Sequence, residues 1–174
     1  MTRNEPMVKP AFDPYAILAA LERHRVTYIL IGSFARVVRG AEELPDGIDL
    51  VVSRRPETFR RLEQVLDDLG ATLADGKTLS LDENTPERLS VVELTSPEGA
   101  IKVVLEPAGT RGYDDLRRAS TREYLGRGLR PSIASTGDLA RMLGALGRDQ
   151  DVSKLQALRR IAELERSLGH GLAL

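Results

Sequence analysis

A glycine–serine pair followed by an acidic strand is the feature of this sequence best suited to phosphate chemistry. Gly32-Ser33 closes a compact apolar run, and Asp49 lies in the next apolar stretch along the chain. Glycine lets the backbone come close to a phosphate, and the first N–H groups of a helix that follows are free to bind it. An aspartate on the neighbouring strand provides a carboxylate for Mg²⁺ beside the same phosphates. The spacing therefore predicts a site for a phosphate or a nucleotide.

Two groups of arginines lie close to this turn in the sequence. Arg36 and Arg39 follow Gly32-Ser33 at positions from which they could contact an anion, and Arg36 is included in the predicted phosphate site. Residues 54–61 form a basic run that offers a contact for nucleic acid. For both groups a solvated surface is the favoured interpretation, since charge runs usually face water.

The elements that would position these residues follow from apolar periodicity and turn residues. Asp13 as N-cap and Pro14 at the first helical position predict a helix that ends near residues 24–26. Strands are predicted at residues 28–31, 48–52, 90–95 and 101–106, with a weak strand pair in 72–82 and an edge strand at 129–134. Helices are predicted at residues 34–39, 56–69, within 108–119, at 135–146 and at 151–168.

This order of elements favours an α/β fold, in which a mixed sheet is flanked by helices and followed by a C-terminal helical segment. Three regions are predicted along the chain. Residues 1–12 form a flexible leader, residues 13–134 form the α/β core, and residues 135–174 form a helical pair packed on that core.

Composition excludes several classes of protein. The chain has 174 residues, the length of one domain, and its net charge of −1 argues against a general binder of nucleic acid. The absence of cysteine excludes disulfides and thiolate metal sites, and the distance in sequence between His24 and His170 argues against a zinc site. Residues 1–10 resemble neither a signal peptide nor a membrane span. A cytoplasmic protein without membrane contact is therefore predicted.

The ordered series resembles the nucleotidyltransferase superfamily, whose signature is an apolar residue, Gly, Gly or Ser, a gap, and Asp-x-Asp in a strand. Gly32, Ser33 and Asp49 match it, and the likeness spans roughly residues 15–164. Residues 103–116 are similar to the later-strand region of small bacterial members, and residues 133–158 are similar to their closing segment. Such members often sit in toxin–antitoxin or phage-defence pairs, so the resemblance implies a cognate protein partner.

The acidic set of that family is incomplete here. If Asp49 is the second acid of Asp-x-Asp, the first acid position holds Gly47, and Asp46 lies on the other side of the pleat. The third acid of the family falls at Lys102, whose ammonium repels Mg²⁺. Lys102 is therefore expected either to pair with Asp49 and take the place of the metal, or to be a solvated surface residue.

Three functions are compatible with this pattern. The primary prediction is a catalytically degenerate protein of the nucleotidyltransferase fold that binds a nucleotide, RNA or a protein partner and requires no cofactor. The first alternative is an active enzyme that uses Mg²⁺ and an NTP to move a nucleotide monophosphate onto a hydroxyl of a small molecule, protein or tRNA. Asp49 would then be the metal ligand and Asp46 the second catalytic acid, helped by Glu93 or Glu106. The second alternative is a structural or dimerising module.

Overall fold

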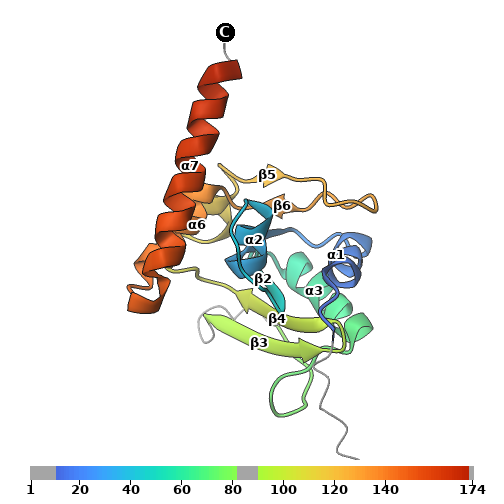
Figure 1. Ribbon diagram of the computed structural model, residues 1–174. Coiled ribbons are helices and arrows are strands. Elements are labelled where there is room, and N and C mark those ends of the chain that lie inside the picture. The colour runs from blue at the N-terminus through green and yellow to red at the C-terminus, as the bar shows by residue number, and fades with distance from the viewer. Residues whose placement is uncertain (1–10, 82–89, 173–174) are drawn as a thin grey trace, which may run out of the picture.

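The computed structural model describes residues 11–81 and 90–172, which form a mixed sheet with helices on both of its faces (Figure 1). The helices are α1 (Pro14–Arg23), α2 (Gly32–Val38), α3 (Pro56–Leu69), α5 (Tyr113–Leu116), α6 (Thr136–Ala145) and α7 (Val152–Leu172), and a 3-10 turn, η1 (Asp149–Asp151), precedes α7. The strands are β1 (Tyr28–Ile31), β2 (Gly47–Val52), β3 (Val91–Ser96), β4 (Gly99–Val104), β5 (Thr121–Arg122) and β6 (Ser132–Ile133).

The six strands are arranged in the order β3-β4-β2-β1-β6-β5. The parallel pairs are β2 with β4 and β1 with β6, whereas the other three neighbouring pairs are antiparallel. The central strands β1 and β2 therefore place Gly32, at the end of β1, beside the beginning of β2. The predicted mixed α/β sheet with a C-terminal helical segment is confirmed.

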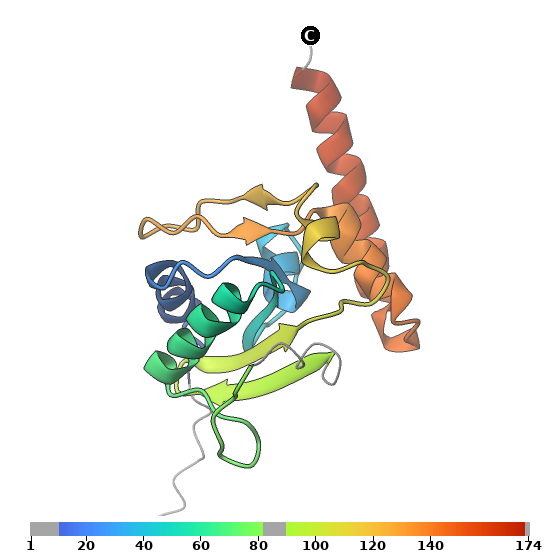
Figure 2. The ribbon, with the colours of Figure 1, turned by 180° about the vertical axis from the view of Figure 1, so that it is seen from behind.

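The alternation of side chains divides the sheet into a closed face and a partly open face. The closed face carries buried side chains of β2 and β4, namely Ile48, Leu50 and Ile101. Helices α1 and α3 cover this face, as the view from behind in Figure 2 shows. Helices α2, α6 and α7 lie on the other face (Figure 1). They leave Asp49 and Lys102 partly exposed.

The helix signals in the sequence are confirmed where a capping residue marks them. The Asp13 carboxylate accepts a hydrogen bond from the Ala16 N–H at 3.1 Å, and the Ser135 hydroxyl accepts one from the Asp138 N–H at 3.0 Å. Helix α3 ends at Gly70, whose φ of 64° is the left-handed conformation that favours glycine.

Two predicted strands are wrong in detail. The described part of 72–82 contains an isolated bridge between Thr72 and Thr95 in place of a strand pair, and Asp82 lies outside the described residues. The strand within 129–134 is β6, and it lies between β1 and β5, so it is not an edge. Strand β5 forms the edge instead. Its two residues are too few to produce a period-2 pattern in the sequence.

Several expectations about the chain ends stay predictions. Residues 1–10 of the predicted leader lie outside the described residues, and Phe12 packs edge-on against the Phe34 ring with centroids 5.9 Å apart. Helices α6 and α7 pack against each other. In the part of the chain that the structure describes, no helix has the length and apolar character needed to span a membrane.

Candidate functional site

Gly32 and Asp49 form the centre of the candidate site. Gly32 begins α2 with a φ of 74°, and its neighbour Ile31 pairs with Asp49 across β1 and β2. A Cβ atom on Gly32 would collide with the Asp49 carboxylate, so that carboxylate lies directly against the glycine backbone. Glycine is required here for its backbone conformation and for the space that it leaves. Ser33 is half-buried and follows Gly32 in α2.

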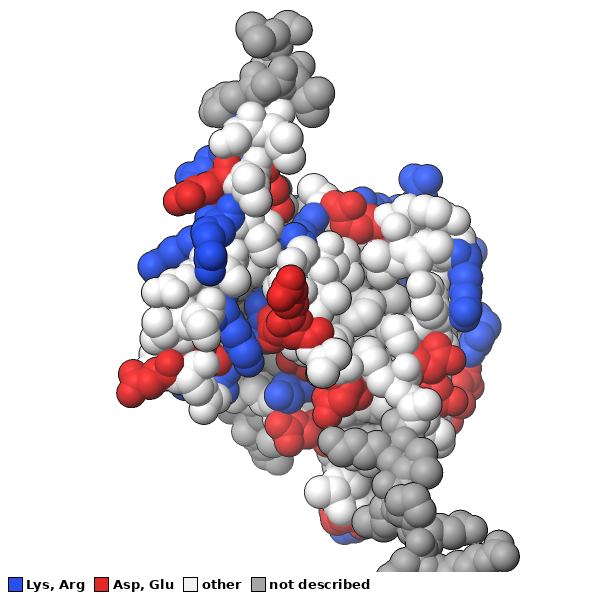
Figure 3. All heavy atoms as spheres, in the orientation of Figure 1, with Lys and Arg blue, Asp and Glu red and all other residues white. Residues whose placement is uncertain are grey.

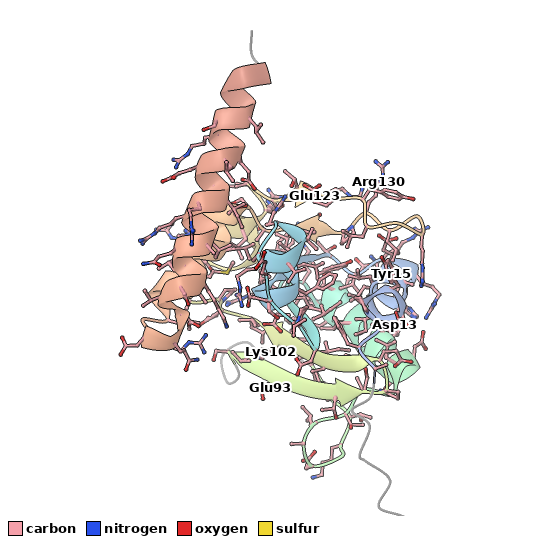
Figure 4. The ribbon with its side chains drawn as sticks, viewed as in Figure 1. Asp13, Tyr15, Glu93, Lys102, Glu123 and Arg130 are labelled. Atoms are coloured by element: carbon pink, nitrogen blue, oxygen red, sulfur yellow. The ribbon has the colours of Figure 1, made fainter. Side chains whose placement is uncertain are left out.

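Lys102 lies in the row of side chains that contains Asp49. The register of β2 with β4 places Lys102 opposite Asp49, and the register of β3 with β4 places Glu93 opposite Lys102. Residues paired in this way point to the same face of a sheet. The Lys102 Nζ forms an ion pair with Glu93 Oε1 at 3.7 Å, and Figure 4 labels both residues.

The ion pair predicted between Lys102 and Asp49 is therefore not the one observed among the described residues. Lys102 pairs with Glu93, whereas the Asp49 carboxylate lies against Gly32. Burial raises the pKa of Asp49, and the charges of Asp46 and Glu93 add to this effect. The positive charges of Lys102 and Arg36 oppose it. Lys102 thus acts on Asp49 as a neighbouring charge.

Gly47, at the position of the first acid, has no room for a side chain. It pairs with Ala100 on β4, and a Cβ atom on Gly47 would collide with the Ala100 carbonyl oxygen. The preceding Asp46 is exposed and lies just before β2, where its carbonyl accepts a hydrogen bond from the Ala100 N–H at 3.3 Å. A carboxylate at residue 47 would therefore require β2 and β4 to move apart.

Arg36 has a carboxylate partner within the protein. Its Nε and Nη2 atoms donate to Glu43 at 2.7 and 2.9 Å, and the two side chains are only 12% and 11% exposed. Lys154 on α7 approaches the same carboxylate at 3.7 Å. Burial would raise the pKa of Glu43, but the Arg36 hydrogen bonds and the charges of Arg36 and Lys154 hold it below its ordinary value. Arg36 is thus anchored near the site. No pattern in the sequence indicates Glu43 as its partner, because Glu43 lies in an irregular loop.

Arg39 connects α2 to the β5–β6 edge. Its guanidinium donates to the Ala134 and Ile133 carbonyls at 3.0 and 2.9 Å, and to Glu123 and Thr121 at 2.8 Å each. The expectation that Arg39 is solvated or contacts an anion is wrong. The Arg39 donors find their acceptors within the protein, because α2 begins directly after β1 and directs this side chain toward β6.

The remaining acids do not complete a metal site. Glu106 pairs with Arg54 at 2.9 Å, and Glu57 pairs with Arg61 at 2.6 Å, so part of the basic run is balanced by neighbouring carboxylates. Within residues 11–81 and 90–172, no three Asp, Glu or His side chains gather in a geometry that could hold a metal ion. With a closed first position and a cation at the third, the donor set does not fit the carboxylate cage that Mg²⁺ needs.

Comparison with solved structures identifies the architecture. TM1012, a Thermotoga maritima protein assigned to the nucleotidyltransferases, is 16% identical with a TM-score of 0.55, and the match covers 84% of this chain and 88% of that one. The lincosamide antibiotic adenylyltransferase LnuA, solved with lincomycin bound, is 16% identical with a TM-score of 0.57 over 87% of this chain and 99% of that chain.

The antibiotic-resistance factor ANT(2'')-Ia is also 16% identical, with a TM-score of 0.50 over 90% of this chain and 95% of that chain. No protein-family model and no curated protein sequence matches the chain. Likeness at this level of identity is a likeness of fold, and it covers nearly the whole length of each relative. The chain has a fold like that of the nucleotidyltransferases, the fold that the resemblance at Gly32-Ser33 and Asp49 implied.

Proposed function

We propose that the chain binds a nucleotide on the Gly32–Asp49–Lys102 face and does not carry out metal-dependent nucleotidyl transfer. The observation that carries this proposal is the register of β2 with β4, which sets Lys102 directly opposite Asp49. The Lys102 ammonium would supply the positive charge for the phosphates, which the family obtains from a metal. The proposed ligand is a nucleoside triphosphate, because LnuA, one of the structural relatives, is an adenylyltransferase.

The ion pair between Lys102 and Glu93 can be broken at a small cost in free energy. Glu93 is 76% exposed and Lys102 is 41% exposed, and an ion pair of this kind in water contributes little to stability. A phosphate that approaches Gly32 and Asp49 can therefore take over the Lys102 ammonium at small cost. Charge-assisted hydrogen bonds to phosphate are stronger than neutral ones.

Transfer requires more than binding. The chemistry depends on cations that bridge the attacking and leaving oxygens, and several carboxylates are needed to hold them. Gly47 admits no side chain, and Lys102 repels a divalent cation from the position beside Asp49. Asp46 and Glu93 are near enough to raise the pKa of Asp49, and this proximity is what supports an active enzyme as the second candidate.

The distribution of surface charge favours a small ligand over RNA. On the face shown in Figure 3, acidic and basic side chains are mixed, and the chain as a whole has a net charge of −1. Proteins that bind RNA through its phosphates usually present a continuous basic surface. We therefore place a nucleotide ahead of RNA, and a cognate protein partner is an outcome of the test below.

The test is calorimetric titration of the full chain with ATP, once in EDTA and once in Mg²⁺. We expect binding in EDTA that Mg²⁺ does not strengthen. Lys102→Gln should weaken it by about tenfold or more, because a charge-assisted hydrogen bond to phosphate is lost. Lys102→Arg should retain it. Arg60→Gln, on the exposed surface of α3, is the matched control and should leave it unchanged.

Two results would overturn the proposal. Binding that requires Mg²⁺, together with transfer of labelled AMP that disappears in Asp49→Asn, would establish the active enzyme. Absence of ATP binding in both buffers would leave a module that binds a protein or serves a structural role, and co-purification from the native host followed by mass spectrometry would then identify a partner.

A further inference from the structure

A second pocket lies at the opposite end of β1 from Gly32. Its volume is about 520 Å³, and it is bounded by the last turn of α1, the first residue of β1, Tyr113 on α5 and the β5–β6 hairpin. Figures 1 and 2 both show this hairpin extending over α1. The pocket shares no residue with the Gly32–Asp49–Lys102 face, so it calls for its own explanation.

Three arginines line this pocket. Arg25 follows the end of α1, Arg122 lies on β5 and Arg130 lies just before β6. In the part of the chain that the structure describes, no carboxylate forms an ion pair with any of them. Glu22 is the one lining carboxylate, and it accepts a hydrogen bond from the Arg130 backbone N–H at 3.2 Å. The pocket therefore carries an excess of positive charge.

Tyr28 adds a hydrogen-bond donor that the protein leaves unused. The residue is 8% exposed and lines the pocket, and its hydroxyl has no hydrogen-bond partner among the described residues. Burial, with a smaller contribution from Glu22, raises the pKa of this hydroxyl, so it stays protonated at neutral pH. Buried tyrosine hydroxyls normally find an acceptor. The hydroxyl oxygen itself has almost no accessible surface, so the side chains that line the pocket would have to shift slightly for a ligand oxygen to accept its hydrogen bond.

Contacts between neighbouring side chains hold the β5–β6 hairpin that forms one wall of the pocket. The Arg127 guanidinium stacks over the Tyr15 ring at 4.3 Å from its centroid and attaches the hairpin to α1. The Arg122 Nε donates to the Arg130 carbonyl at 3.0 Å, and Arg130 lies over the Tyr124 ring. Figure 4 shows Tyr15 and Arg130 on the same side of the molecule. Such fixed donors lose little entropy when a ligand binds.

Another pocket, of about 410 Å³, offers a comparison because it is also lined by three arginines. One of them, Arg141, forms ion pairs with Asp115 and Asp138 at 3.2 Å each. Two lining carboxylates, Asp114 and Asp115, thus face these arginines, whereas Glu22 is the one lining carboxylate in the pocket at Tyr28.

We propose that the pocket formed by Tyr28, Arg25, Arg122 and Arg130 binds a small organic oxyanion. The guanidinium groups would hold its phosphate or carboxylate, the Tyr28 hydroxyl would donate to one oxygen, and Tyr113 would contact the body of the molecule. Phosphate and carboxylate share this recognition chemistry, because arginine presents its donors in a fork that matches either group. The volume suits a ligand of mononucleotide size or smaller.

The experiment titrates the full chain in separate arms with inorganic phosphate, AMP and benzoate, and follows binding by calorimetry. All three arms use the Lys102→Gln variant, so that nucleotide binding at the Asp49 face is weakened, and comparison with the same variant carrying Arg122→Gln isolates binding at this pocket. We expect saturable binding of at least one probe. The probe that binds most tightly shows whether the pocket prefers a phosphate or a carboxylate.

Two variants make the proposal specific. Arg122→Gln should weaken binding by about tenfold, the usual effect of losing one charge-assisted hydrogen bond. Tyr28→Phe should weaken it several-fold and yet leave the melting temperature unchanged or raised, because it removes a buried hydroxyl without a partner. A merely structural tyrosine would lower the melting temperature instead. Arg118→Gln, in the other pocket, is the control.

The proposal is overturned if none of the three probes binds at millimolar concentration, or if binding is unaffected by both Arg122→Gln and Tyr28→Phe. The variants distinguish the two proposals, because Lys102→Gln acts at the Asp49 face, whereas Arg122→Gln and Tyr28→Phe act at this pocket at the other end of β1.

Discussion

The two ends of β1 differ in whether their positively charged side chains are paired with carboxylates of the protein. At the Gly32 end, Arg36 pairs with Glu43 and Lys102 pairs with Glu93, so each cation near Asp49 has a carboxylate partner. At the Tyr28 end, three arginines line a pocket without a carboxylate ion pair among the described residues. The end that matches the sequence signature is therefore compensated, and the end without a signature is the one with unused donors.

The difference shows that a sequence motif does not determine how the charges around it are paired. Gly32 makes the tight connection between β1 and α2, with the Asp49 carboxylate packed against its backbone. The charges around that turn are set by residues 43, 93 and 102, which no motif fixes. Four substitutions test this contrast, beginning with the one expected to have the largest effect.

Gly47→Asp, which restores the first acid of the signature, should destabilise the protein by about 4 kcal/mol. The new side chain would collide with the Ala100 carbonyl, and it would place a second carboxylate beside the half-buried Asp49. Chemical denaturation measures the change. Gly137→Asp in the first turn of α6 is the matched control, because no backbone atom blocks a Cβ there and an acid suits a helix start.

A Gly47→Asp variant that folded normally and bound Mg²⁺ would break the contrast. It would show that β2 and β4 can separate, and that the Gly32 end is one substitution away from a metal site.

Glu43→Gln should cost about 3 kcal/mol. The change removes the charge that compensates the Arg36 guanidinium, whose side chain is only 12% exposed, and an uncompensated charge in such a position is strongly destabilising. Urea denaturation at neutral pH gives the value. Glu57→Gln, which breaks the exposed pair with Arg61, should cost about 0.5 kcal/mol or less. Equal losses from the two variants would mean that the Gly32 end is no more compensated than open surface.

Arg39→Gln should cost about 2 kcal/mol, since it removes the donor for two backbone carbonyls and for Glu123. The effect should be concentrated in β5 and β6, whose amides are expected to exchange with deuterium faster while those of β2 and β4 are unchanged. Because Arg122 and Arg130 lie on this hairpin, the same variant should also weaken oxyanion binding at the Tyr28 pocket. Uniformly faster exchange would show that Arg39 stabilises the whole sheet.

The sequence predicted the parts of the molecule that depend on local patterns. The cap at Asp13, the helix at residues 56–69 and the apolar runs of β1 and β2 are each determined within a few residues, and all were found. The prediction that Lys102 occupies the position of the third acid came from the resemblance to the nucleotidyltransferases. Period-2 alternation then placed its side chain on the same face as Asp49.

The remaining features depend on segments far apart in sequence. Arg39 bonds to Ile133 and Ala134, and the Tyr28 pocket combines the end of α1 with residues 113, 122 and 130. No spacing rule connects such positions, because they meet only after β6 has paired with β1. Glu43 was missed for a similar reason, since its loop has no periodic pattern to fix its direction.

Asp49→Asn is expected to have the smallest effect of the four substitutions. The direction of the change in melting temperature shows whether burial or the neighbouring cations dominate at Asp49. Burial raises the pKa of Asp49 in the folded protein, so the stabilising effect of its protonated form is present at low pH and is lost as the pH rises through that raised pKa. Asparagine does not ionise, so the variant should melt at a higher temperature than the parent at neutral pH. The two should converge as the pH falls below the ordinary aspartate pKa of 3.8.

Asp68→Asn provides the control of opposite sign. A hydrogen bond from His24 lowers the pKa of Asp68, so its carboxylate stabilises the fold above its ordinary pKa, and the variant should melt slightly lower at neutral pH. If Asp49→Asn also lowered the melting temperature at neutral pH, the Lys102 and Arg36 charges would outweigh burial at Asp49. The ionised Asp49 would then stabilise the Gly32 end through the neighbouring cations. The two ends of β1 would differ in that the charges at the Gly32 end all have partners, whereas the arginines at the Tyr28 end have no carboxylate partner among the described residues.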